Sequence, residues 1–310
     1  MSANVVLETR GLSKRFGEAT AVDGLSLRVR EGEVYGFLGP NGAGKTTSIR
    51  MMAGLLRPSA GEVLVRGEPV GVDAPEGRRL LGLCPQENVV YPELTARENL
   101  VYAASLFGVP RGERRARADA LLERLGLAEK ADERASALSG GMKRRLTLAL
   151  ALVHDPPVVV LDEPEAGLDP QTRVAVREFV RSLAPRKTVI LTSHNMDEVE
   201  RLADRVAILD HGRLVEEGTP AQLKAKLGDA DALEIKLERG GPEVAEALRA
   251  FGEVSHQQDR LVLRGRDLAR RLAGVLEQVT KTGGSVQDVR YRGATLEDVF
   301  IALTGRGLRE

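Results

Sequence analysis

The sequence predicts an α/β protein built on a parallel sheet and followed by a second, small α+β domain. Short apolar runs bounded by breakers recur before residue 228, as expected of strands that are covered on both faces. One of these runs, VYGFL at 34–38, leads into a glycine-rich loop and then into a helical pattern, TTSIRMMAGLL. From Ala232 the pattern changes to ALEIKLE, an alternation of apolar and charged residues that is typical of a half-buried strand.

The first domain is expected to mix strands with one long helical stretch. Short strands separated by turn signals are expected at residues 5–9, 25–29, 34–38 and 62–66. From Thr95 to about Leu152 the sequence is mostly helical, and Thr95 with Glu98 can form a capping box. Within this stretch, acidic residues interspersed among the arginines favour a solvated face over a nucleic-acid patch. Further buried strands are expected at residues 158–161, 188–192 and 206–209.

The second domain is expected to begin where the first closes, near residue 228, and to span about 229–310. Its strands are expected at residues 232–238, 261–263 and 286–291, with helices at about 244–251 and 268–279. A last helix should begin at Thr295, with Asp298 as its capping partner, and end at Gly305. This segment contains no glycine-rich loop, metal-ligand cluster or nucleophile–base pair.

Composition limits the partners. The 310 residues include 45 Lys and Arg against 45 Asp and Glu, so the net charge gives no reason to expect nucleic acid or a membrane surface. The single cysteine, Cys84, excludes an intramolecular disulfide and fits a reducing compartment. The start lacks the layout of a secretory signal, and no apolar run approaches the roughly 18–20 residues that span a bilayer. We therefore expect a soluble, cytoplasmic protein, in which transport would need another chain for the path.

The strongest motif is a phosphate-binding loop, GPNGAGKT, which matches GxxxxGK[ST] between an expected strand and an expected helix. Its glycines let successive backbone N–H groups point at phosphate oxygens, reinforced by the positive end of the following helix. Lys45 can reach the β- and γ-phosphates, and the Thr46 hydroxyl can coordinate Mg²⁺. By itself the loop predicts binding of ATP or GTP by Gly39, Pro40, Asn41, Gly42, Ala43, Gly44, Lys45, Thr46 and Thr47.

Two acidic residues follow the strand VVVL. Because ligands bind at the carboxyl edge of a parallel sheet, Asp162 could hold the Mg²⁺ shell, directly or through water. Glu163 comes next and could polarise the attacking water as a general base. An acidic pair at a strand end fits a helix cap as well as it fits catalysis, but the phosphate loop upstream favours catalysis.

A second anion-binding loop, LSGGMKRRL at 138–146, lies between these motifs. Its serine and two glycines open a helix and offer a hydroxyl, backbone N–H groups and the positive end of a helix dipole. Considered alone, this pattern is more typical of an ordinary N-cap. One chain, however, then has two phosphate-binding loops and one set of catalytic groups. A two-fold dimer resolves this, because the partner's nucleotide could then face Ser139, Gly140 and Gly141.

These motifs, in this order, resemble those of ABC-type ATP-binding subunits over about residues 5–228. The resemblance implies a P-loop NTPase with a RecA-like core, an antiparallel β subdomain and a helical subdomain at about 92–152. It implies that Gln86 contacts Mg²⁺ and the attacking water, alongside the metal ligands Thr46 and Asp162. It also implies that His194 in LTSHN is the switch residue that contacts the γ-phosphate.

The same resemblance assigns further residues. Phe16 in SKRFG lies where the family stacks an aromatic side chain on adenine. Asp169 in AGLDP resembles the aspartate that communicates across the dimer, and residues 87–99 resemble the surface that receives a coupling helix from a membrane subunit. Glu165 is a departure, because many relatives have a small hydroxyl residue there. Its carboxylate is expected to change local charge near the dimer interface and to affect hydrolysis little.

The C-terminal segment ATLEDVFIALTGRGLRE is similar to the tail of the drug and antibiotic efflux branch, such as the daunorubicin-resistance type. The resemblance implies an ATP-hydrolysing homodimer that drives a separate membrane permease for export, from the inner face of the cell membrane. Related branches move other cargoes with similar motors, so the cargo stays open.

Two other classes of protein are alternatives to this assignment. Soluble ABC ATPases that act on the ribosome or nucleic acid generally carry a long coiled-coil insert or two motors in one chain. Here the insert between Gln86 and Ser139 is short, and a second GxxxxGK[ST] loop is absent. A nucleotide-binding regulator without turnover is disfavoured by the presence of Glu163 and His194.

Overall fold

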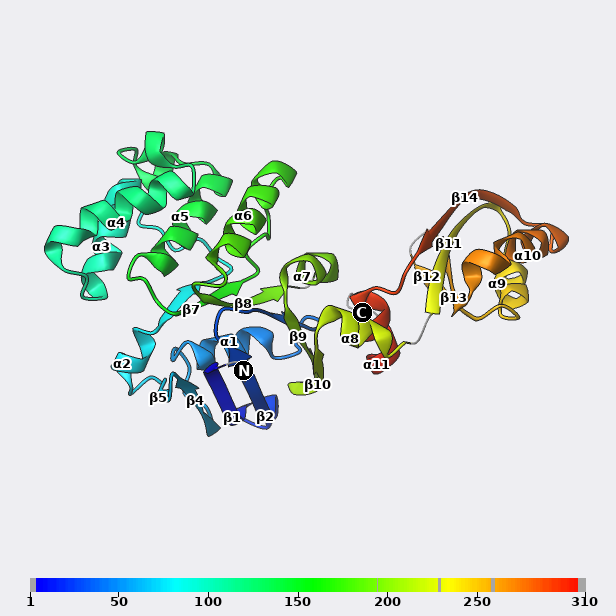
Figure 1. Cartoon of the computed structure of the whole chain (residues 1–310), viewed down its shortest axis with the longest axis horizontal. Coiled ribbons are helices and arrows are strands. Elements are labelled where there is room, and N and C mark those ends of the chain that lie inside the picture. The colour runs from blue at the N-terminus through cyan, green and yellow to red at the C-terminus, as the bar shows by residue number, and fades with distance from the viewer. Residues whose placement is uncertain (1–3, 194, 228–229, 258–259, 306–310) are drawn as a thin grey trace. The chain divides into compact units, whose positions relative to one another are not determined.

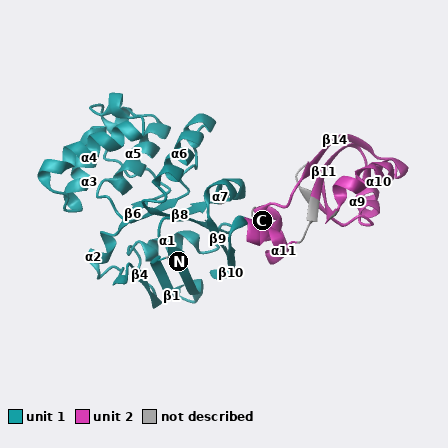
Figure 2. Cartoon of the chain, in the orientation of Figure 1, with its two compact units in different colours: residues 1–220, 308–310 teal, residues 221–307 magenta. Residues whose placement is uncertain are grey.

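The computed structural model describes residues 4–193, 195–227, 230–257 and 260–305. They divide into two compact units, which part between Pro220 and Ala221 (Figure 2). The division falls before the boundary expected near residue 228, because the last strand of the first unit ends at Gly218 and the short helix α8 (Pro220–Ala225) already begins the second unit.

The first unit is built on a six-stranded sheet with the order β10-β9-β3-β8-β7-β6. Its strands are β3 (Val34–Leu38), β6 (Leu81–Cys84), β7 (Val158–Asp162), β8 (Thr188–Ser193), β9 (Arg205–Asp210) and β10 (Arg213–Gly218). All neighbouring pairs are parallel except β9 with β10. Every residue of β3, β7 and β8 is buried, which explains their uninterrupted apolar runs. The sequence analysis missed β6, whose apolar run LGLC is only four residues long and contains a glycine, and β10, which is partly charged and gives no apolar run.

A second, antiparallel sheet has the order β2-β1-β4-β5, with strands β1 (Val5–Phe16), β2 (Ala19–Arg30), β4 (Ala60–Val65) and β5 (Glu68–Pro69). Strands β1 and β2 pair along their whole length, with several register shifts, and are longer than predicted. Backbone pairing continues beyond the apolar residues, which sequence patterning alone does not reveal. Helix α1 (Lys45–Met52) shares one hydrophobic core with both sheets, and Gly54 follows with a positive φ of 67°.

The remaining helices of the first unit are α2 (Pro75–Arg78), α3 (Ala96–Leu106), α4 (Arg111–Arg124), α5 (Gly140–Leu152), α6 (Pro170–Leu183) and α7 (Met196–Leu202), with short 3-10 turns at Ala128–Lys130 and Ala135–Ala137. The predicted capping box of Thr95 and Glu98 is confirmed at the start of α3. In Figure 1, α3, α4 and α5 gather on one side of the parallel sheet, away from β1, β2 and β4. The fold class is therefore the predicted one: a parallel core with an antiparallel sheet and a helical subdomain.

The second unit has the element order of a split βαββαβ fold, followed by a terminal helix. Its elements are β11 (Ala230–Arg239), α9 (Pro242–Leu248), β12 (Glu253–Gln257), β13 (Arg260–Arg266), α10 (Leu268–Lys281), β14 (Ser285–Arg292) and α11 (Leu296–Thr304). The four strands form one antiparallel sheet, β12-β13-β11-β14. Buried residues of α9 and α10 share a hydrophobic core with β11 and β13.

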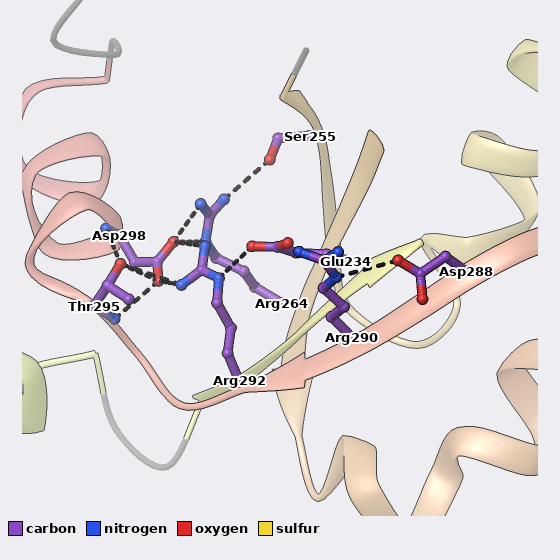
Figure 3. A network of polar contacts seen from close by, with 8 residues as sticks. All are labelled: Glu234, Ser255, Arg264, Asp288, Arg290, Arg292, Thr295 and Asp298. Carbon is purple, nitrogen blue, oxygen red and sulfur yellow. Dashed lines mark hydrogen bonds and ion pairs between the residues drawn. The ribbon is translucent and has the colours of Figure 1, made fainter. Parts of the chain in front are cut away.

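Charged side chains form a network at the start of α11 (Figure 3). Asp298 is buried and accepts hydrogen bonds from Arg264 of β13 and Arg292 of β14, and Arg292 also donates to Glu234 of β11. The same carboxylate accepts from the Thr295 backbone at 3.0 Å, which completes the predicted capping box. Gly305 then ends the helix with a positive φ of 72°, as predicted.

Candidate active site

The parallel sheet brings four strand ends to one edge. Strand β3 runs into the phosphate loop, β6 into Pro85 and Gln86, and β7 ends at Asp162, beside Thr192 of β8. These segments are far apart in sequence, but the carboxyl ends of parallel strands meet, and ligands bind there.

The phosphate loop has the backbone that its glycines permit. Gly42 and Gly44 have positive φ values of 81° and 94°. A Cβ at Gly44 would lie 2.5 Å from the Ala21 carbonyl oxygen, so no other residue fits. The Lys45 ammonium is buried and donates to the carbonyl oxygens of Gly39 and Pro40 at 2.6 and 2.9 Å. Burial lowers the pKa of Lys45, and the nearby carboxylates of Glu163 and Asp162 oppose that shift.

The acidic pair lies opposite this loop. The buried Asp162 carboxylate accepts a hydrogen bond of 2.5 Å from the Thr192 hydroxyl. Glu163 has a positive φ of 47°, which is unusual for a residue with a side chain, and its N–H donates to the Thr192 carbonyl and hydroxyl. Gln86 Nε2 donates to Glu163 Oε2 at 3.2 Å, so the two predicted catalytic side chains are in contact.

A cavity of about 490 Å³ joins these groups, and it is lined by Ala21, Asn41, Gly42, Gly44, Lys45, Thr46, Thr47, Gln86 and Glu163. Other predicted residues lie outside its lining: Gly39, Pro40 and Ala43 of the phosphate loop, the buried Asp162, and Phe16, which is 53% exposed at the end of β1. The Lys14 ammonium lies 5.2 Å from the centre of the Phe16 ring. His194 falls outside the described residues.

The predicted Mg²⁺ ligands offer oxygen donors that suit this hard cation. Thr46 and Gln86 line the cavity, and Asp162 ends the neighbouring strand. Within the described ranges, no group of three or more His, Cys, Asp or Glu side chains is placed to hold a metal ion.

The second loop is an N-cap in this chain. Ser139 accepts a hydrogen bond from the Met142 N–H at 3.3 Å at the start of α5. Asp169 likewise caps α6 by accepting from the Thr172 N–H at 2.9 Å, and hydrogen bonds from Thr172 lower the pKa of that carboxyl. A Cβ at Gly141 would lie 3.8 Å from Asp169 Oδ2, so the two caps are neighbours. Neither lines the cavity of the phosphate loop.

The sequence analysis did not single out several residues that shape this site. Thr192 bonds both acidic residues, and Arg144 of α5 donates to backbone oxygens on both sides of the site. Glu165 was expected to alter local charge, but it is only 4% exposed and forms a bidentate pair with Arg177 of α6 at 2.7 and 2.9 Å. The only sequence signal for Arg144 was its place in LSGGMKRRL, where helix periodicity cannot show what it contacts.

A groove of about 460 Å³ lies elsewhere on the first unit. Its lining includes several exposed apolar side chains: Leu55, Val89, Tyr91, Tyr102, Leu106 and Phe107. The buried Asn99 shapes its rim, because its amide bonds the backbone of Tyr91 and of Thr95. Apolar side chains gathered in a groove are typical of an interaction site.

Cys84, at the end of β6, is fully buried. Burial raises the pKa of its thiol to about 11, so it is protonated and unreactive at neutral pH.

The chain is similar to known proteins over most of its length. Residues 22–166 match the ABC transporter family. The chain is 42% identical to the Nod factor export ATP-binding protein I of Ralstonia nicotianae, over 98% of this chain and 95% of that protein. It is 41% identical to the daunorubicin resistance ATP-binding protein DrrA3 of Streptomyces coeruleorubidus, over 98% and 97% of the two chains.

Solved structures match about 70% of the chain. An ATP-binding subunit of an ABC transporter superposes with a TM-score of 0.66 and 31% identity, over 72% of this chain and 93% of that one. A dimeric ATP-binding cassette bound to ADP and Pi superposes with a TM-score of 0.63 and 27% identity, over 69% and 98%.

The chain therefore belongs to the ABC transporter ATP-binding proteins. It is the ATPase subunit of an ABC transporter, in which ATP hydrolysis drives transport. Among the described helices, none has the length and hydrophobicity needed to cross a bilayer.

Proposed function

We propose that two copies of the chain hold two ATP molecules at a shared interface. Each nucleotide would lie on residues 39–46 of one copy and against Ser139, Gly140 and Gly141 of the other. The supporting observation is that Gln86 and Glu163 line the cavity of the phosphate loop. The second loop, residues 139–141 and here called the serine loop, lies outside that cavity in the same chain. A solved relative that is a dimer adds to this. Asp169, beside Gly141, would then contact the partner.

Hydrolysis would follow from the contact between Gln86 and Glu163. Glu163 takes a proton from water as the water oxygen bonds to the γ-phosphorus, and the bond to the ADP oxygen breaks. Lys45 and the backbone N–H groups of the loop stabilise the phosphate charge. His194 would contact the γ-phosphate, and Phe16 would stack on adenine.

Magnesium would be held by Thr46, Gln86 and Asp162. When bound, the cation neutralises charge on the β- and γ-phosphates. The Thr192 hydroxyl, which bonds Asp162, would orient that carboxylate toward the cation shell.

A membrane permease would dock in the apolar groove beside α3. The groove includes residues of the segment 87–99, which follows Gln86 directly, so a change at the nucleotide site could reach it through a short length of chain. Co-purification of the chain with a membrane permease would test this docking.

The transporter would be an exporter, and the chain would lie at the cytoplasmic face of the cell membrane, held there by its permease. The support is the identity of over 40% with proteins named for Nod factor export and daunorubicin resistance. We further propose that residues 1–228 form the motor and 229–310 an accessory domain that stabilises or regulates the dimer.

The test of the proposed site is Glu163→Gln. Loss of the general base should lower steady-state ATP turnover by about 10²-fold or more, because proton transfer contributes that much in enzymes. ATP binding should survive, so an ATP-bound dimer should accumulate in size-exclusion chromatography with MgATP. Turnover equal to that of the unmodified protein would refute the role of Glu163, and a monomer that still binds ATP would refute the shared interface.

A further inference from the structure

Arg144 has an unusual set of partners. Its side chain projects from α5, and the residue is 2% exposed. The guanidinium donates to five backbone carbonyl oxygens, with Nε on Pro164 at 3.1 Å, Nη1 on Pro85 and on Gln86 at 3.0 Å, and Nη2 on Asp162 and Glu163 at 2.9 Å each. A guanidinium has five N–H donors, so each donor has its own carbonyl. A lysine at this position could make three such bonds at most.

The five carbonyls belong to the two segments that carry the proposed catalytic side chains. Pro85 and Gln86 follow β6, whereas Asp162 ends β7 and residues 163–164 follow it. A single planar group thus fixes the distance between the two backbones. The side-chain contact of 3.2 Å between Gln86 and Glu163 depends on that distance.

Arg144 also bears on the backbone strain at Glu163. A positive φ of 47° at a residue with a side chain persists only where its surroundings hold it on both sides. Thr192 holds the Glu163 N–H, and Arg144 holds the Glu163 carbonyl. Without the guanidinium, the Glu163 carbonyl would keep its bond from the Ala166 N–H at 3.1 Å, but the peptide after Glu163 would be held less firmly and the carboxylate could shift in the cavity.

We propose that Arg144 is a positioning residue for ATP hydrolysis, which fixes the backbones of Gln86 and Glu163 relative to each other and to α5. The inference rests on the catalytic role proposed above for Glu163. Since α5 begins at the serine loop, Arg144 also joins the loop that faces the partner's nucleotide to the catalytic groups of its own chain. The side chain does not line the ATP cavity, so it acts on the rate of hydrolysis and not on ATP affinity.

The test compares Arg144→Met with Arg145→Met in the full-length chain. Arg145 is a matched control, because it is the next residue of α5 and also donates to backbone carbonyls, those of Leu125 and Gly126, which lie away from the cavity. For Arg144→Met we expect kcat to fall about 10²-fold, as small misplacements of catalytic groups do. The KM for ATP should stay within about twofold. Arg144→Lys should recover part of the loss, and Arg145→Met should keep its kcat.

Turnover is counted per site that binds a fluorescent ATP analogue, so that a loss of folded protein does not lower the measured kcat. A purely structural role would lower the melting temperature and leave this kcat unchanged, which would overturn the proposal. Equal losses in Arg144→Met and Arg145→Met would overturn it as well, as would a raised KM with an unchanged kcat. If Arg144→Met does not fold, Arg144→Lys and Arg144→Gln carry the same comparison. Glu163→Gln is measured in parallel: if it retains turnover, the proposed site fails, whatever the Arg144 variants show.

Discussion

Each of the two units buries a carboxylate that pairs with arginines, and the two carboxylates differ in the segment of the chain that they anchor. In the first unit, Glu165 pairs with Arg177 directly after the catalytic segment. In the second, Asp298 pairs with Arg264 and Arg292 and caps a terminal helix (Figure 3). Glu165 comes two residues after Glu163, which lines the ATP cavity. Among the described residues, the contacts of Asp298 are with strands and a helix of its own unit.

A buried ion pair between a carboxylate and arginine is therefore expected to have a different role in each unit. A buried carboxylate is stable only when paired, and removing it leaves the facing arginines without one of their charged partners. In the second unit the consequence should be confined to stability. In the first unit it should extend to turnover, because the segment that Glu165 anchors leads from Glu163 to Asp169.

The largest expected effect on stability is that of Asp298→Ala. It leaves Arg264 and Arg292 without the carboxylate between them and removes the cap of α11, so the unfolding free energy of the second unit should fall by about 3–5 kcal/mol. Hydrogen exchange of β13 and β14 measures this. The control is Glu246→Ala, whose ion pair with Arg249 is exposed, with an expected cost below about 1 kcal/mol. If ATP turnover fell together with this stability, the claim that Asp298 has only a structural role would be wrong.

The same carboxylate predicts a pH dependence. Burial would raise the pKa of Asp298, but hydrogen bonds from Arg292, Thr295 and Arg264 outweigh it and lower the pKa to about 2. Because the folded-state pKa lies below the ordinary value of 3.8, this stabilisation is complete above that pH and is lost as pH falls through 2. Acid titration of hydrogen exchange in β13, with Asp298→Asn as the reference, checks it. Loss of protection at pH 5 that depends on Asp298 would contradict the assignment.

The next effect in size is that of Glu165→Ala, which should cost about 3 kcal/mol, since Arg177 is part-buried and loses a bidentate partner. It should also lower ATP turnover, by about tenfold, because the loop between Glu163 and Asp169 loses its anchor on α6. Thermal unfolding and steady-state turnover are measured on the same preparation. Glu178→Ala, an exposed carboxylate on the same helix, should change neither. Lost stability with full turnover would show that both buried carboxylates are purely structural.

The smallest expected effect concerns His154, which lines the apolar groove and whose ring stacks on Phe107 and bonds the Leu81 carbonyl. Burial lowers the pKa of His154 to about 4, so the folded state prefers the neutral ring. Stability should therefore fall as pH drops below the ordinary value of 6.5, by about 2 kcal/mol between pH 7 and pH 5. Urea unfolding of the protein and of His154→Gln across this range gives the difference. The exposed His211→Gln should behave like the unmodified protein, and an equal pH dependence in both variants would exclude His154 as its cause.

The sequence by itself determined the features that depend on local pattern. The fully buried strands gave apolar runs, the capping boxes at Thr95 and Thr295 gave their spacing, and the phosphate loop gave a motif whose glycines the backbone requires. Short or charged strands such as β6, β10 and β12 were not predicted, because they are strands on account of their pairing partners and not of their own side chains.

Tertiary structure alone decided which distant residues meet. The contact of Gln86 with Glu163, the hold of Thr192 on both acidic residues and the five carbonyls on Arg144 all join segments from different strands. It also decided that Glu165 is buried and paired, where the sequence had suggested only a change in local charge. The physical reason is that spacing along a chain fixes the face on which a side chain lies, whereas its partner is fixed by the order of strands in the sheet.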